Sequence, residues 1–203
     1  MTDRDVDRFG RWAPGYDRSL LQRVLFGPVQ KATVAAAAGH CARPRAILDV
    51  GCGTGRLLRR LAVLFPTAEL VGADAAGGMI EQARAAVPAN LSVRFVEAFA
   101  EELPFPDASF DLITSTVSFH HWADQRRGLR EVRRVLAPGG LFVLTDALAD
   151  GWLWQILVVS GGGRLLRPGE LDAMLVTEHL RFVARSPVPR VRAIKVTLAR
   201  ATG

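Results

Sequence analysis

The chain has 203 residues, a length that suits one domain with a sizeable core. Its composition, 49% hydrophobic and 23% charged, is typical of a globular protein, and no apolar run approaches the ~20 residues that cross a bilayer. The first ten residues mix charges of both signs without an apolar stretch, so we expect no secretory signal and a cytoplasmic location.

The net charge of +6 would suit a nucleic-acid-binding protein. However, nearly all of the positive charge is arginine, Lys31 and Lys195 being the only lysines, which indicates a compositional bias. The arginine doublets at 59–60, 126–127 and 133–134 fall on the polar faces of helical patterns, where a solvated surface explains them. The two cysteines are not spaced as metal ligands, so we expect no metal.

The first forty residues have helical patterns. Asp17 can cap a helix with apolar residues at 20, 21, 24 and 25, and Pro28 begins a second helix that ends at Gly39. From Ala46 onward, strand and helix periods alternate. The expected strands are 46–50, 69–73, 91–96, 110–117 and 141–144, and the expected helices follow Gly55, Asp74 and His121.

The tail after residue 150 is less regular. We expect a helix over "WLWQILVVS", a flexible joint at 161–163 and a helix over 168–175. Two late strands, around 180–185 and 193–199, are separated by "SPVP" and can pair antiparallel at one edge of the sheet. The alternation before them predicts an α/β fold with a parallel sheet and helices on both faces.

The stretch "ILDVGCGTG" carries the clearest chemistry. A glycine loop between a strand and a helix is the usual ligand site of an open α/β sheet, and glycine lets the backbone approach a ligand closely. A dinucleotide site more often has its third glycine one position later, where this chain has Arg56. Asp49, two residues before Gly51, would attract a cationic or amine-bearing ligand and repel a pyrophosphate.

This stretch resembles the first motif of class I S-adenosylmethionine-dependent methyltransferases. The segments "LVGAD", "AEELPFPDASFDLI", "HHWAD" and "EVRRVLAPGGLFVLTD" follow in the family's order, and together with "RWAPGYD" they are most similar to small-molecule methyltransferases of the quinone-biosynthesis kind. The resemblance implies a doubly wound, mostly parallel, seven-stranded Rossmann-like sheet with an antiparallel edge strand. It also implies one domain over 1–203, divided into a helical N-terminal lid (1–40), a cofactor-binding core (46–146) and C-terminal helices and edge strands (151–203).

The resemblance assigns S-adenosylmethionine as the cofactor. In the family the glycine loop wraps the amino-acid end of the cofactor, and an acid at the tip of the second strand, here Asp74, holds the ribose hydroxyls. The cofactor-binding residues that follow are Tyr16, Asp49, Val50, Gly51, Cys52, Gly53, Gly55, Asp74, Ala75, Met79, Ala98, Phe99, Ala100, Glu101 and Thr116. Family members commonly carry an aspartate at position 99, which accepts a hydrogen bond from adenine. Phe99 cannot accept it, so we expect somewhat weaker binding.

His120 and His121 follow the strand whose end points toward the transferred methyl group, and either can be the general base for an acceptor that must lose a proton. The alternative is that both belong to the scaffold. Tyr16 contacts the cofactor or, equally well, anchors the lid by packing. The apolar residues from Trp152 to Val159 line an acceptor pocket, touch a membrane surface or simply pack in the core.

The sequence therefore predicts methyl transfer to a small, apolar or aromatic acceptor, on oxygen or carbon. Two alternatives stay open: a non-catalytic relative that binds the cofactor, and an NAD-dependent oxidoreductase. A nucleic-acid methyltransferase is disfavoured, because residues 115–118 read Ser-Thr-Val-Ser where amino-methylating enzymes carry an Asp/Asn-Pro-Pro-aromatic loop. A small-molecule acceptor is the expected partner, and a homodimer is left open.

Overall fold

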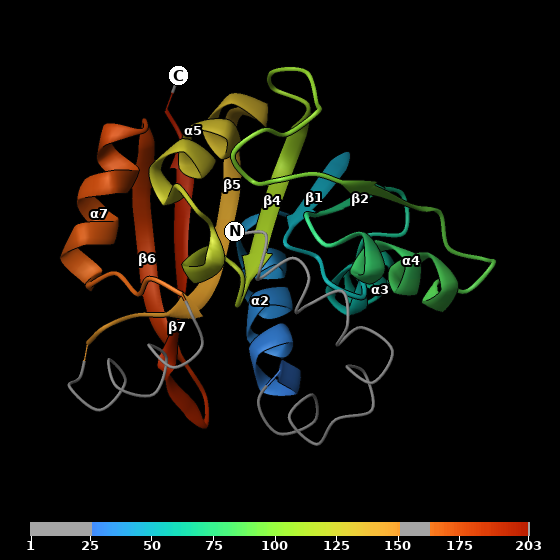
Figure 1. The fold of residues 1–203 in the computed structure, drawn as a ribbon, viewed down its shortest axis with the longest axis horizontal. Coiled ribbons are helices and arrows are strands. Elements are labelled where there is room, and N and C mark those ends of the chain that lie inside the picture. The colour runs from blue at the N-terminus through green and yellow to red at the C-terminus, as the bar shows by residue number, and fades with distance from the viewer. Residues whose placement is uncertain (1–25, 151–162, 203) are drawn as a thin grey trace.

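The computed structural model describes residues 26–150 and 163–202 (Figure 1). Its helices are α2 (Gly27–His40), α3 (Arg56–Leu64), α4 (Gly77–Ala86), α5 (Gln125–Val135) and α7 (Pro168–Thr177), with a short 3-10 helix η2 (Phe119–His121). Its strands are β1 (Ala46–Val50), β2 (Glu69–Asp74), β3 (Val93–Glu97), β4 (Phe110–Thr116), β5 (Leu136–Ala147), β6 (Leu180–Val188) and β7 (Val191–Ala201). None of the helices in these two ranges is long and apolar enough to cross a bilayer.

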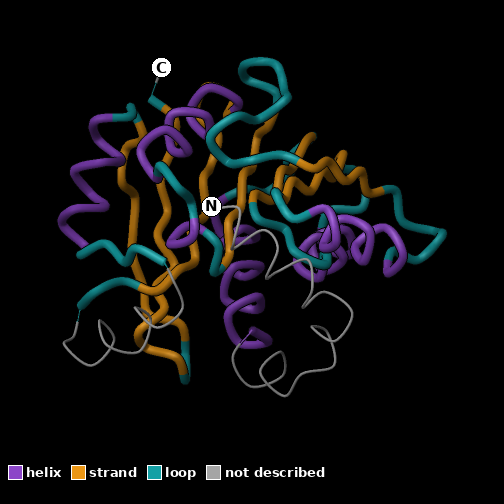
Figure 2. Tube along the Cα trace, viewed as in Figure 1, coloured by secondary structure: helices purple, strands orange, loops and turns teal. Residues whose placement is uncertain are grey.

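The strands form one seven-stranded sheet in the order β3-β2-β1-β4-β5-β7-β6 (Figure 2). The first five in this order run parallel, and β7 runs antiparallel to both of its neighbours, β5 and β6. The expected doubly wound sheet, with an antiparallel pair at one edge, is therefore confirmed. The reversal of strand order between β1 and β4 marks the point at which such sheets open a ligand crevice.

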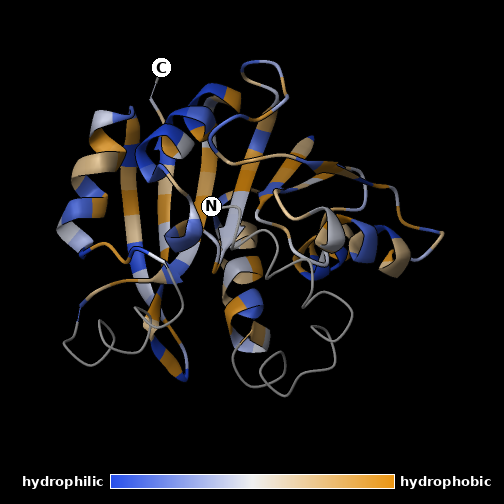
Figure 3. Cartoon of the chain, viewed as in Figure 1, coloured by the Kyte–Doolittle hydropathy of each residue, from blue (hydrophilic) through white to orange (hydrophobic). Residues whose placement is uncertain are grey.

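Two apolar clusters, one on each face of the sheet, hold the helices in place. Consecutive strand residues point to opposite faces, so that Ile47 contributes to the cluster beneath α2, α3 and α4, whereas Leu48 contributes to the cluster beneath α5 and α7. The inner strands are accordingly apolar along most of their length (Figure 3). The apolar residues 57, 58 and 61 of α3, and residue 65 directly after it, are all buried.

The structure differs from the sequence prediction at two turns. The strand expected at 141–144 begins earlier, at Leu136, and the segment "APGG" at 137–140 lies inside β5 as an irregularity. The register shifts there against β4, and Gly139 takes a φ of +71°. Likewise "SPVP" does not separate the last two strands, because β6 continues to Val188 and a two-residue turn with Arg190 at φ +68° follows. The expected helix after Asp17 and the segment 152–159 lie outside the described residues.

Candidate functional site

A cleft opens at the carboxyl ends of β1, β2 and β4, next to the start of α3. Its walls come from five parts of the chain: the start of α2, the glycine loop, the end of β2 with α4, the segment after β3, and the turn between β4 and α5. The residues that line it are Phe26, Gln30, Asp49, Val50, Gly51, Cys52, Gly53, Thr54, Arg56, Leu57, Asp74, Ala75, Met79, Ala98, Phe99, Ala100, Glu101, Thr116, Val117, Ser118, His121 and Trp122.

The glycine loop is held against β2 by its own backbone. The N–H groups of Gly51 and Cys52 both donate to the Ala73 carbonyl, at 2.8 and 3.0 Å. Gly51 has a φ of +73°, and a Cβ there would lie 1.8 Å from the Ser118 hydroxyl oxygen, so only glycine fits. Gly53 also has a positive φ, +52°, but a Cβ there would meet nothing within 4 Å. The loop thus presents bare backbone to the open side of the cleft at Gly53.

Gly55 does not line the cleft, although it belongs to the same loop. It precedes the first residue of α3 with a φ of +71°, and a Cβ there would lie 2.8 Å from the Phe95 ring. Its glycine is required for this backbone conformation and for close packing against β3. The structure therefore separates Gly55 from Gly51 and Gly53, with which the sequence grouped it.

Asp49 lies at the bottom of the cleft and is almost completely buried, with 2% of its surface exposed. Its carboxylate accepts a hydrogen bond from the Thr114 hydroxyl at 2.7 Å. Burial raises the pKa of Asp49 to about 7, against the Thr114 hydrogen bond that lowers it, and the nearby Asp74 carboxylate raises it further. A positively charged group in the cleft would stabilise the ionised carboxylate.

Asp74 lies at the end of β2 with both carboxylate oxygens tied to backbone. Oδ2 accepts from the Gly53 N–H at 2.8 Å, and Oδ1 accepts from the Ala76 N–H at 2.9 Å. Burial raises the pKa of Asp74, although these two bonds lower it. Because each carboxylate oxygen can accept more than one hydrogen bond, Asp74 is fixed in place and can still receive hydroxyl donors from a ligand.

The segment after β3 forms another wall of the cleft. The Ala98 N–H donates to the Asp74 carbonyl at 3.0 Å, so this segment begins beside the acid that ends β2. Phe99 is 43% exposed and lines the cleft together with Ala98, Ala100 and Glu101. Its ring is thus available to a flat ligand group.

The turn after β4 carries a backbone feature that the sequence does not reveal. Val117, a β-branched residue, has a φ of +52°, an uncommon and strained conformation for its type. Its N–H donates to the Thr145 carbonyl at 2.8 Å, which ties the turn to β5. The turn places Ser118 over Gly51, where its hydroxyl oxygen accepts a hydrogen bond from the Trp122 indole at 3.2 Å.

The two candidate bases have different surroundings. His121 lines the cleft, whereas His120 is buried and does not. The His120 Nδ1 lies 2.7 Å from Asp146 Oδ1, and the His120 ring lies 4.0 Å from that of His121. Burial lowers the pKa of His120, but the Asp146 carboxylate raises it by more, so that the net shift is upward. Of the pair, only His121 can face a ligand directly.

Several lining residues were not predicted, because their sequence context gives little indication of a site. Phe26 and Gln30 come from the start of α2, which is distant in sequence from the glycine loop, and Trp122 reaches the cleft only through the turn after β4. Thr54 lies inside the glycine motif, and Arg56 and Leu57 follow it directly, so that the whole motif extended into α3 would have included all three. Tyr16 lies outside the described residues. Ala75, Met79 and Thr116 line the cleft as predicted positions.

The arrangement fits S-adenosylmethionine. A nucleoside joined to a cationic amino-acid end needs a carboxylate for the ribose hydroxyls, and the fixed carboxylate of Asp74 can accept from them. It also needs an anion near its positive charge, and the buried carboxyl of Asp49 lies on the same cleft. Bare backbone at Gly53 leaves room for close approach. A pyrophosphate would instead lie beside the carboxylates of Asp49 and Asp74, which repel it.

Comparison with known proteins supports this interpretation. The methyltransferase domain family matches residues 48–144 of the chain. A demethylmenaquinone methyltransferase from Deinococcus radiodurans is 43% identical over 145 residues, which are 69% of this chain and 58% of the relative. A second such enzyme, from Thermus thermophilus, is 47% identical over 51% of this chain and 47% of its own length. The chain thus spans about half the length of these curated relatives.

A solved structure shares the fold. The 1,6-didemethyltoxoflavin N1-methyltransferase of Burkholderia thailandensis, determined with bound 1,6-didemethyltoxoflavin and S-adenosylhomocysteine, superposes with a TM-score of 0.74. The match covers 98% of this chain and 87% of that enzyme at 21% identity. At that level of identity the likeness establishes the fold, and it agrees with the topology described above.

Proposed function

We propose that the chain is a class I methyltransferase that transfers a methyl group from S-adenosylmethionine to a small acceptor. The match of residues 48–144 to the methyltransferase domain family and the similarity to demethylmenaquinone methyltransferases support this proposal. The observation that carries the proposal is the pairing of two acids, the buried Asp49 and the partly buried Asp74, across a glycine loop whose backbone lines the cleft. An NAD-dependent oxidoreductase is disfavoured by the same pair, since its pyrophosphate would lie beside them.

Different residues around the cleft would bind different parts of the cofactor. Asp49 and the Gly51–Gly53 backbone would hold the amino-acid end of the cofactor, Asp74 the ribose, and residues 98–101 the adenine. When bound, the cofactor supplies an electrophilic methyl group on a sulfonium centre, which needs an aligned nucleophile and little other catalysis. The protein contributes this alignment and excludes water, through walls that are already formed on the described side of the cleft.

His121 is the residue that we propose as a general base, where the acceptor must lose a proton. It lies in the cleft, and an imidazole is the side chain that most often serves as a general base. His120 would act through it, as a neighbour anchored by Asp146. An acceptor that is already a carbon nucleophile would not need this step.

We further propose an apolar or aromatic acceptor, methylated on oxygen or carbon. The aromatic side chains of Phe26 and Trp122 line the cleft and are not among the residues assigned to the cofactor. The quinone-type names of the two curated relatives support an acceptor of this class. The turn after β4 lacks the Pro-Pro-aromatic loop that serves a flipped base, which supports a small molecule over a nucleic acid.

Calorimetric titration of the chain with S-adenosylmethionine and, separately, with NAD tests the proposal. We expect binding of S-adenosylmethionine only, and an Asp74→Ala variant that has lost most of that affinity because the ribose hydroxyls lose their acceptor. Binding of NAD with no response to S-adenosylmethionine would refute the proposed function. An Asp74→Ala variant that binds as well as the parent would show that the ribose lies elsewhere.

A further inference from the structure

The segment after β3, residues 98–103, has no regular secondary structure of its own, and its residues 98–101 form a wall of the cleft. Its start is fixed by the hydrogen bond from Ala98 to β2, and its middle by a bond from the Glu102 N–H to the Phe99 carbonyl at 3.1 Å. Between these points Phe99 is partly exposed. The conformation of the wall therefore depends on what holds its far end.

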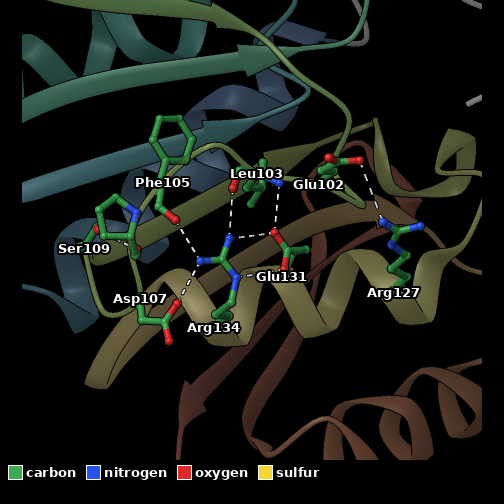
Figure 4. Close-up of polar contacts among 9 residues, drawn as sticks. Glu102, Leu103, Phe105, Asp107, Ser109, Arg127, Glu131 and Arg134 are labelled. Carbon is green, nitrogen blue, oxygen red and sulfur yellow. Dashed lines mark hydrogen bonds and ion pairs between the residues drawn. The ribbon is translucent and has the colours of Figure 1, made fainter.

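That far end is held by one side chain of α5. The Arg134 guanidinium donates to the carbonyls of Leu103 and Phe105, at 2.9 and 2.7 Å, and to the Asp107 carboxylate at 2.8 Å (Figure 4). It also makes two bonds to the Glu131 carboxylate, at 2.8 and 2.7 Å. All five N–H donors of the guanidinium are thus in use.

Glu131 completes the contact from the same helix. Its Oε2 accepts a hydrogen bond from the Leu103 N–H at 2.9 Å, so both backbone groups of Leu103 are bound by this pair. Burial strengthens these hydrogen bonds, since only 32% of the Arg134 side chain and 19% of the Glu131 side chain are exposed. Upstream, the Asp124 N–H at the start of α5 donates to Glu101 at 3.1 Å. Helix α5 and the residue before it are thus hydrogen-bonded to Glu101 and to Leu103.

The same helix begins directly after the turn that brings His121 and Trp122 to the cleft. The wall assigned to adenine and the wall assigned to the acceptor are therefore joined through α5. A wall already held in its binding conformation avoids the entropic cost of ordering it when the ligand arrives.

We propose that Arg134 is a positioning residue for cofactor binding. Through its hydrogen bonds to Leu103, Phe105 and Glu131, it holds residues 98–103 in the conformation that lines the cleft. This inference rests on the proposed function for the identity of the ligand. Lysine cannot replace this arginine, because it has three donors on a single nitrogen and no planar fork.

The test compares full-length Arg134→Gln and Arg134→Lys with a matched control, Arg127→Gln. Arg127 lies on the same helix and carries the same charge, but within the described ranges its side chain makes a single ion pair, with exposed Glu102 at 3.8 Å (Figure 4). Beyond that pair it acts on Glu131 only through its charge. Two readouts are needed: the dissociation constant for S-adenosylhomocysteine by calorimetry, and amide hydrogen exchange in peptides that cover residues 98–108. Thermal unfolding identifies the variants that are folded.

We expect both Arg134 variants to bind S-adenosylhomocysteine about tenfold more weakly, with faster exchange confined to residues 98–108. Arg127→Gln should stay within about twofold of the wild type in both readouts, as exposed ion pairs contribute little. If Arg134→Gln does not fold, Arg134→Lys decides by the same two measurements.

A folded Arg134 variant with wild-type affinity and exchange would overturn the proposal, and so would an equal loss in Arg127→Gln. These results differ from a failure of the proposed function. A wild type that does not bind S-adenosylhomocysteine refutes the function, whereas a binding wild type matched by its Arg134 variants refutes only the positioning role.

Discussion

The ionisation of Asp49 should make cofactor affinity depend on pH. Its pKa of about 7 means that the carboxyl is about one-tenth ionised at pH 6 and about nine-tenths ionised at pH 8. A ligand whose positive end requires the carboxylate should therefore bind roughly tenfold more tightly at pH 8 than at pH 6, a gain of about 1.4 kcal/mol. The direction follows from the raised pKa: the binding form of Asp49 appears only as the pH rises through 7.

The same shift affects the ligand-free protein in the opposite sense. Between about pH 4 and pH 7 the folded chain keeps a proton on Asp49 that the unfolded chain has released, so the contribution of this group to stability falls as the pH rises. The loss reaches at most about 4 kcal/mol at high pH. An Asp49→Asn variant, which can still accept from Thr114, should be more stable than the wild type at pH 8 and bind the cofactor more weakly.

Calorimetric titration with S-adenosylmethionine at pH 6, 7 and 8, on wild type and Asp49→Asn in parallel, measures the effect. The ligand's own amino group titrates in this range, but it does so equally in both titrations, and the difference between the proteins isolates Asp49. An affinity that changes equally between pH 6 and pH 8 in the wild type and in Asp49→Asn would refute the reasoning.

Two further predictions concern the scaffold of the cleft. Gly51→Ala and Gly53→Ala both place alanine at a positive φ, which costs about 1–2 kcal/mol, but only the Gly51 variant also collides with Ser118. Thermal unfolding should show the larger loss for Gly51→Ala, partly restored by adding Ser118→Gly; equal losses would contradict the contact. Asp146→Asn removes the anionic partner of buried His120 and should destabilise the protein by about 1–3 kcal/mol in urea unfolding. The loss should be greater at pH 6 than at pH 9, because a raised histidine pKa stabilises below about pH 6.5 and the gain disappears above the folded value; a loss independent of pH would argue against the ion pair.

Most of the helices and strands were predictable, because apolar residues recur at a different spacing along a helix than along a strand. The strand at 46–50 was placed at its observed ends, and the buried face of α3 follows from leucines three and four residues apart. The errors fall at proline and glycine. "APGG" and "SPVP" suggest turns by composition. However, β5 pairs with β4 on both sides of residues 137–140, and β6 pairs with β7 as far as Val188. Such long-range pairing is not visible in local composition.

The candidate site was predictable where its residues lie within one motif and not where tertiary structure assembles them. Asp49, Gly51 and Asp74 are marked by their place at strand ends. By contrast, the sequence does not indicate that His121 lines the cleft whereas its neighbour His120 is buried. That difference depends on the direction in which the 3-10 helix turns each side chain. The role of Arg134 likewise depends on carbonyl groups about thirty residues upstream, which it meets only in the folded chain.

The central claim is that the glycine-loop cleft holds S-adenosylmethionine between Asp49 and Asp74. The most direct measurement is a crystal structure of the chain grown with saturating S-adenosylhomocysteine. The nucleoside should lie with its ribose at Asp74, its adenine beside Phe99 and its amino-acid end at Gly51–Gly53. A cleft that is empty or filled by side chains under these conditions would contradict the claim.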